Sequence, residues 1–249
     1  MKSIFLLRQR LGFEAARYDF FPYRFGPFSN EIYRDLSFLE KEGFFRETEM
    51  NLTKRGAETL SVLPKNEKMK NCLEQITKDF SGVRAIKNFV YEKYPEFTIR
   101  SNCPKKIISN KKGVCTIGYE GKTMDGFLNL LIQKNVSLVI DVRKNAFSMK
   151  RGFSKTPLKK SLEMGGINYI HFPDLGIPPS KRTDLNSSES YQELFKEYSK
   201  SLSSKKERIE EIRCLGNQQK IALLCFEADP AYCHRGILSE IVSDRTVHL

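Results

Sequence analysis

The most reactive side chains of this sequence gather near its end. Cys233, His234 and Arg235 are consecutive, and Glu227 precedes Cys233 by six residues. A thiol at the start of a helix and beside cationic side chains has a lowered pKa, which favours the nucleophilic thiolate. A carboxylate and an imidazole can act as general acid and base. We therefore predict that Glu227, Cys233 and His234 are catalytic. Arg235 is predicted to bind the substrate.

Each of these residues also has a purely structural interpretation. Cys233 can cap the helix that follows it, and Glu227 can pair with an arginine and hold its own loop. A metal site formed by His171, Cys233 and His234 is a further alternative, although its spacing matches no recognised zinc motif. We therefore predict no metal and no cofactor.

A second set of polar residues follows two apolar runs. Tyr119 comes directly after the run VCTIG, whereas Asp141 and Arg143 lie at the end of the run SLVIDV. Polar side chains at the carboxyl ends of buried strands are placed to meet a ligand. We predict a catalytic role for Asp141 and substrate contacts for Tyr119 and Arg143.

Seven basic residues and no acidic one occur between Arg143 and Lys160. Phe147 and Phe153 lie within this basic run, as in surfaces that stack on nucleic-acid bases. Because the run starts where a predicted strand ends, it should flank the ligand crevice. The alternative is a solvated helix face with two phenylalanines in the core. The predicted substrate contacts of the run are Lys150, Arg151 and Lys155.

Apolar runs of strand length alternate with helical patterns from Val114 onward. The runs cover residues 114–118, 137–142, 167–172 and 220–226, and helices are predicted at 123–133, 156–164, 187–200, 204–215 and 234–243. Continuous apolar strands separated by helices are typical of a mostly parallel sheet covered on both faces. The predicted fold class is α/β, with a Rossmann-like three-layer domain over residues 114–249. Because parallel strands end at one edge of the sheet, we expect one pocket there. It should be surrounded by Asp141, Arg143, Glu227, Cys233, His234 and Arg235.

The first part of the chain has a different pattern. Ser29 is placed to cap a helix that runs to Glu42, two short strands with a polar turn near residues 47–50 follow, and Thr53 begins another helix. Helix, hairpin and helix in this order are typical of a winged helix, so we predict a small winged-helix-like α+β domain over residues 1–65. Residues 66–113 are predicted to be a helical connector, broken near 81–82, with a polar linker at its end.

Charge and cysteine usage limit the classes of function. The chain has 249 residues and a net charge of +12, which favours a nucleic acid or a nucleotide as partner. No apolar run is long enough to span a bilayer, so no membrane association is expected. The six cysteines form no CxxC pair, which argues against a disulfide scaffold and favours a reducing cytoplasm.

Several stretches of the second half resemble an uncharacterised family, domain of unknown function 488. They are TIGYEG at 116–121, DVR at 141–143, the region 147–155, GINYIHFPDLG at 166–176 and LLCFEADPAYCHR at 223–235. The resemblance covers about 115–243 and implies a fold and a set of polar positions, but no reaction. The first half resembles what precedes this domain in longer members. Its PYRFGPFS turn is similar to a turn in some phage-defence accessory domains, which implies a DNA-associated context or a protein partner.

Three functions follow as hypotheses. The first is an enzyme that acts on a phosphate-bearing nucleotide or nucleic acid at the Arg/Glu/Cys-His site. The second is a non-catalytic DNA-binding regulator or a sensor of an anionic ligand. The third is a thiol-based redox or group-transfer protein centred on Cys233. Convergence of several polar groups on one crevice favours the first hypothesis over a scaffold, whereas the N-terminal pattern favours the second.

Overall fold

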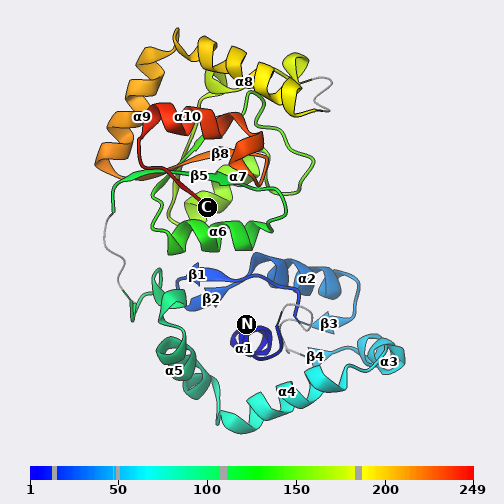
Figure 1. The fold of residues 1–249 in the computed structure, drawn as a ribbon. Helices are drawn as coiled ribbons and strands as arrows, with labels where there is room; N and C mark the ends of the chain where they lie inside the picture. The colour runs from blue at the N-terminus through cyan, green and yellow to red at the C-terminus, as the bar shows by residue number, and fades with distance from the viewer. Residues whose placement is uncertain (13–15, 47, 49–50, 107–110, 183–186) are drawn as a thin grey trace. The chain divides into compact units, whose positions relative to one another are not determined.

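The computed structural model describes the chain except residues 13–15, 47, 49–50, 107–110 and 183–186 (Figure 1). The chain divides into two compact units, Met1–Ile107 and Ile108–Leu249. Among the described residues, no helix combines the length and the apolar character needed to cross a membrane.

The N-terminal unit is mainly helical and contains two short hairpins. In chain order its elements are α1 (Lys2–Leu11), β1 (Phe21–Tyr23), β2 (Gly26–Phe28), α2 (Asn30–Lys41), β3 (Phe45–Arg46), β4 (Asn51–Leu52), α3 (Lys54–Val62), α4 (Glu67–Asp79), α5 (Val83–Lys93) and a 3-10 turn, η1 (Pro95–Thr98). Both hairpins are antiparallel. The predicted order of helix, hairpin and helix is therefore present as α2, β3–β4 and α3. Most of the polar turn expected at 47–50 lies outside the described residues.

Local sequence signals explain where these elements begin and end. Gly43 follows α2 with φ 74°, a conformation that glycine adopts without steric cost. The amides of Gly43 and Phe44 donate to the carbonyls of Glu40 and Leu39, which satisfies the last turn of α2. Thr53 caps α3 by accepting a hydrogen bond from the Gly56 amide at 3.1 Å.

One hydrophobic core holds the N-terminal unit together. It includes Phe5 and Leu6 of α1, Ile76 of α4 and Val90 of α5. The Phe5 ring also makes edge contacts with the rings of Phe20, Tyr94 and Phe97. The helices of the predicted connector therefore pack in the same core as α1. Assignment of residues 1–65 to the winged-helix class stays a prediction.

The C-terminal unit is an α/β domain around one five-stranded parallel sheet. Its elements are β5 (Gly113–Gly118), α6 (Met124–Gln133), β6 (Leu138–Asp141), α7 (Lys155–Met164), β7 (Asn168–His171), the 3-10 turns η2 (Pro173–Leu175) and η3 (Pro179–Lys181), α8 (Ser188–Leu202), α9 (Lys206–Gln218), β8 (Lys220–Cys225), the 3-10 turn η4 (Pro230–Tyr232), α10 (His234–Val242) and β9 (Val247–His248). The strand order is β7-β6-β8-β5-β9, and every neighbouring pair is parallel. The predicted α/β class and parallel sheet are confirmed.

Side chains of the central strands point alternately to the two faces of the sheet, and helices cover each face. Leu138 and Ile140 of β6 and Leu223 of β8 belong to a core that includes residues of α8, α9 and α10. The other face is covered by α6 and α7, whose buried side chains include Phe127 and Leu158. Figure 1 shows α6 and α10 on opposite sides of the sheet. The two-residue strand β9, which pairs with β5, was not predicted, because residues 247–248 carry no apolar run.

Candidate functional site

A cleft of about 590 Å³ opens where the central strands end. Tyr119 lies directly after β5, Arg143 lies just after β6, and Cys225 is the last residue of β8. These three side chains line the cleft together with His234, the first residue of α10. The topology thus brings residues more than a hundred positions apart to one edge of one sheet. Of the predicted site residues, Tyr119, Arg143, Lys150 and His234 line this cleft.

Asp141 and Arg143 form a buried ion pair beneath the cleft. The Arg143 Nε and Nη2 atoms donate to the two carboxylate oxygens of Asp141 at 2.8 and 2.6 Å. Burial alone would lower the pKa of Arg143, but hydrogen bonds and the charge of Asp141 raise it above its ordinary value. The hydroxyl of Tyr169 donates to Asp141 Oδ2 at 2.7 Å. Arg143 Nη1 donates to the Tyr119 hydroxyl and to the Phe153 carbonyl, each at 2.9 Å. We call Asp141, Arg143, Tyr119 and Tyr169 the Asp–Arg network.

The hydrogen bonds of the Asp–Arg network indicate a structural role. Both oxygens of the fully buried Asp141 accept hydrogen bonds, and the Arg143 guanidinium donates to three different residues. The Tyr119 ring stacks on Phe153 with centroids 4.5 Å apart and planes 9° apart. The network therefore fixes the ends of β5, β6 and β7 relative to one another. It leaves Asp141 no oxygen directed at the cleft.

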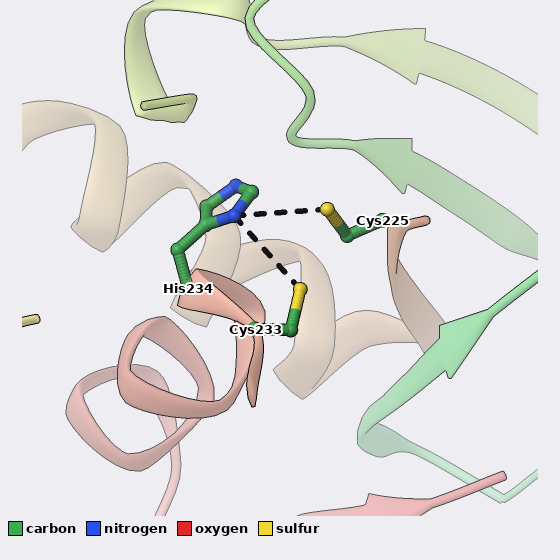
Figure 2. Close-up of side chains that lie close together, drawn as sticks. All are labelled: Cys225, Cys233 and His234. Carbon is green, nitrogen blue, oxygen red and sulfur yellow. Dashed lines mark hydrogen bonds between the residues drawn. The ribbon is translucent and has the colours of Figure 1, made fainter. Parts of the chain in front are cut away.

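Cys225, Cys233 and His234 form a second buried group, which we call the Cys–His cluster (Figure 2). His234 Nδ1 lies 3.6 Å from Cys225 Sγ and 3.9 Å from Cys233 Sγ. On the other side of the ring, Nε2 is 3.0 Å from the Val142 carbonyl oxygen. A carbonyl only accepts, so His234 Nε2 donates a proton to it, and Nδ1 is the ring nitrogen that faces both sulfurs. The three ligand-type atoms thus face one another.

The two thiols differ in acidity although both are buried. Burial raises the pKa of Cys233, but hydrogen bonds from Cys225 and His234 outweigh burial and lower this pKa to about 6. Hydrogen bonding to Cys233 and burial both raise the pKa of Cys225 well above its ordinary value. Cys233 also caps the N-terminus of α10, where the helix dipole favours negative charge. The cluster therefore favours one thiolate next to one thiol.

Glu227 and Arg235 hold the loop between β8 and α10. Burial raises the pKa of Glu227, but hydrogen bonding from a neighbouring thiol and the charge of Arg182 lower it overall. One Glu227 oxygen pairs with the Arg182 guanidinium, and the other accepts from Cys225 Sγ at 3.3 Å. Arg235, which is 1% exposed, donates through Nη1 and Nη2 to the carbonyls of Glu227 and Ala228. The geometry gives Arg235 a positioning role instead of a substrate contact.

Two glycines let the loops approach at this edge. A Cβ atom added at Gly118 would lie 1.7 Å from the Glu227 carbonyl oxygen, and one added at Gly176 would lie 2.0 Å from the Lys144 amide nitrogen. Any other side chain at these positions would force the backbone apart. Gly118, within TIGYEG, and Gly176, which follows PDL, are therefore required by close backbone packing around the cleft.

Residues 123–242 match the family model described as Domain of unknown function DUF488. That segment includes the whole Cys–His cluster, and the order of elements in it is the parallel α/β order described above. The C-terminal unit is a DUF488 domain. No curated protein and no solved structure matches the chain.

The basic run of the DUF488 domain divides between two surfaces. Lys150 lines the cleft and donates through Nζ to the Tyr119 carbonyl oxygen at 2.9 Å. Burial lowers the pKa of Lys150. Arg151 is exposed and Lys155 opens α7, and neither is among the residues that line the cleft. Phe147 is 71% exposed and lines the cleft, whereas Phe153 is fully buried. The expected pair of stacking rings is thus reduced to Phe147.

The structure adds residues that the sequence did not single out. Cys225 lies in an apolar run, where a cysteine is typically an inert core residue, but in the structure it ends β8 and faces His234. The metal-compatible group among the described residues contains Cys225 in the place where we had considered His171. His171 instead places its Nε2 2.9 Å from the Arg143 carbonyl oxygen. Arg182 also lines the cleft. The available signal for Cys225 was its position two residues before Glu227, at the very end of its strand.

Proposed function

We propose that the DUF488 domain is an enzyme that binds a phosphate-bearing nucleotide or nucleic-acid strand in the cleft and acts on it at the Cys–His cluster. The observation that carries the proposal is the composition of the cleft. Lys144 and Lys150 line it beside the exposed ring of Phe147, and Cys225 and His234 lie at its base. Cations attract phosphates, and an exposed ring offers a base a stacking surface.

The charge of the cleft supports an anionic substrate. The described residues that line it include no aspartate or glutamate. Arg143 is paired with the buried Asp141 and Arg182 with the partly buried Glu227, so Lys144 and Lys150 are the cations best placed to meet a ligand. Lys144 is exposed, and an ammonium carries three donors, so the hydrogen bond of Lys150 to a carbonyl leaves it further donors. Phosphate oxygens are the natural acceptors.

The cluster supplies groups for hydrolysis or transfer at a phosphate, a base or a glycosidic bond. Cys225 and His234 of the cluster line the cleft, where a ligand held by the lysines would present its reactive bond. Glu227 accepts a hydrogen bond from Cys225 Sγ and pairs with Arg182, and these contacts hold the loop after β8 in place. In this proposal Cys233 and His234 act in catalysis, Glu227 supports them, and Asp141 acts only through the Asp–Arg network.

A binding panel with matched lysine variants tests the proposal. Single-stranded and duplex DNA and RNA, and free nucleotides, are titrated against the wild type, the Lys144→Gln/Lys150→Gln variant and the Lys159→Gln/Lys160→Gln variant. The second pair lies on exposed positions of α7, outside the cleft lining, and controls for net charge. For single strands the log–log salt slope is about −0.7 per phosphate contact, so loss of two cleft contacts should make it shallower by about 1.4. Equal weakening by both pairs, or binding that ignores salt, would exclude the cleft as a phosphate site.

A non-catalytic DNA-binding regulator, or a sensor of an anionic ligand, is the second candidate function. The order α2, β3–β4 and α3 favours it, because it fits a winged helix that binds DNA or a protein partner. A role in phage defence and a location in the cytoplasm belong to this proposal as well. All six cysteines are free thiols, which suits a reducing compartment. Tight salt-dependent binding without any product would favour this candidate.

A further inference from the structure

We propose that Cys225, Cys233 and His234 bind a zinc ion through their Sγ, Sγ and Nδ1 atoms, with a fourth coordination position open to the cleft. The three atoms lie within 4.8 Å of one another. The binding of the ion stands on this geometry alone, and its use in catalysis rests on the proposed function.

The separations between the atoms fit a tetrahedral ion. With Zn–S bonds of about 2.3 Å and a Zn–N bond of about 2.0–2.1 Å, a tetrahedron places each sulfur about 3.6 Å from the nitrogen. The observed distances from His234 Nδ1 are 3.6 Å to Cys225 Sγ and 3.9 Å to Cys233 Sγ. An ion can therefore enter with shifts of a few tenths of an ångström at most along these two edges.

The ring of His234 is already oriented as a ligand. Its Nε2 proton is donated to the Val142 carbonyl, so Nδ1 is the ring nitrogen that remains for a metal ion, and it is directed toward the two sulfurs (Figure 2). Metal-binding histidines commonly fix their tautomer through such a bond from the second ring nitrogen. The Tyr198 ring packs edge-on against the imidazole with centroids 5.4 Å apart, which holds its plane. The distances of 3.6 and 3.9 Å from Nδ1 to the two sulfurs also suit two ligands of one ion.

Charge balance suits a buried ion at this place. Zinc binds both cysteines as thiolates, so the two thiolates and the Zn²⁺ ion together carry no net charge. Such a centre avoids the cost of an isolated buried charge. Any proton that the ion displaces leaves to solvent through the cleft, which Cys225 and His234 line.

The fourth position is left to an exogenous ligand. Glu227 lies near Cys225, but it is not part of the group of atoms that face one another, and it is engaged by Arg182. Cys225 and His234 line the cleft and Cys233 does not, so the open side of the site is the side of the cleft. Zinc sites with three protein ligands and one open position are of the catalytic type, in which the ion binds water or a substrate oxygen. A phosphate-bearing ligand held by Lys144 and Lys150 would approach from that side.

Cobalt and zinc titration of the full chain tests the site. The protein is reduced with a phosphine, stripped with a chelator and titrated with Co²⁺, then with Zn²⁺. We expect one ion per chain, thiolate-to-cobalt absorption, and visible bands of tetrahedral intensity that Zn²⁺ abolishes. Cys225→Ser and Cys233→Ser should each weaken zinc binding more than the roughly 10–100-fold that loss of an outer partner costs. Cys115→Ser, a buried cysteine that donates to the Ile221 carbonyl far from the cluster, should leave binding unchanged.

A measurement on the wild type keeps the test independent of how well the variants fold. X-ray absorption of the zinc-loaded protein should show two sulfur and about two nitrogen or oxygen neighbours, as expected for two thiolates, one imidazole and one exogenous oxygen. Absence of stoichiometric binding, a shell without sulfur, or equal binding by the Cys225→Ser variant would overturn the proposal. These outcomes involve no nucleotide, so they leave the lysine test of the proposed function untouched. Conversely, a cleft that binds no phosphate would not remove a zinc ion that is bound.

Discussion

The Asp–Arg network and the Cys–His cluster lie at the same edge of the same sheet, and both are buried. They differ in how well their polar atoms are satisfied. Asp141 and Arg143 meet through bonds of 2.6 and 2.8 Å, and Tyr169 and Tyr119 add two more charge-assisted bonds. In the cluster, the sulfur atoms are 3.6 and 3.9 Å from the imidazole nitrogen that faces them.

This difference in pairing indicates that the two groups have different roles, one in stability and one in chemistry. A buried polar group that is fully paired rigidifies its surroundings, whereas removal of one partner leaves a costly unpaired charge. Polar atoms that face one another without short hydrogen bonds can still bind a ligand or an ion, or take part in a reaction. We therefore assign the stability of the strand ends to the Asp–Arg network, and we propose that the Cys–His cluster carries the function. The expected effects of substitutions follow from this division.

Asp141→Asn is expected to have the largest effect on stability. It leaves the Arg143 guanidinium buried without its counter-charge, which costs about 3–5 kcal/mol of unfolding free energy. Urea unfolding followed by circular dichroism measures the loss. The control is Lys159→Gln, which breaks an exposed pair with Glu163 and should cost less than about 0.5 kcal/mol. Comparable losses for the two variants would remove the distinction between a buried scaffold and a surface pair.

Tyr169→Phe is expected to have an intermediate effect. The change removes one hydrogen bond to the charged Asp141 carboxylate and nothing else of the ring, so it should cost about 1.5–3 kcal/mol. The same denaturation measures it. In a cycle with Asp141→Asn, the two losses should not add, because both residues belong to one network. Additive losses would show that Tyr169 contributes through packing alone.

Cys225→Ala and Cys233→Ala are expected to have the smallest effects on the metal-free protein. Each removes one heavy atom from a packed site and should cost about 1 kcal/mol. Reduced, chelated samples are compared with Cys115→Ala, which removes a buried thiol on the same strand layer outside the cluster. A loss of several kcal/mol at Cys225 or Cys233 alone would place the cluster in the scaffold after all.

The sheet and its helices could be predicted because buried parallel strands leave long apolar runs in the sequence. Strand β9 could not, since two residues at an edge carry no periodic signal. The parallel topology predicted that polar residues cluster at the strand ends. It could not predict the role of each residue, because the burial and pairing of Asp141 depend on Tyr119 and Tyr169, which come from other strands or loops.

Cys225 shows a different limit of the sequence. An apolar run that ends in Cys suggests a core thiol, and its spacing from Cys233 matches no familiar metal motif. The turn η4 lies between β8 and α10, and after it the chain has turned back so that His234 faces Cys225 at the end of β8. Phe153 likewise appeared exposed within a basic run, but the ring of Tyr119 covers it. In both residues a contact from a distant segment decides the role.

Turnover by the cysteine variants tests the central claim most directly. The wild type, Cys225→Ala, Cys233→Ala and Tyr169→Phe are incubated with end-labelled single-stranded and duplex oligonucleotides and with nucleotides, and products are measured under conditions where each variant is folded. We predict that the wild type converts at least one of these substrates and that each cysteine variant is slower by about 100-fold or more with binding retained. Tyr169→Phe should keep most of the activity. Cysteine variants as fast as the wild type, or losses that only follow the unfolded fraction, would contradict the account.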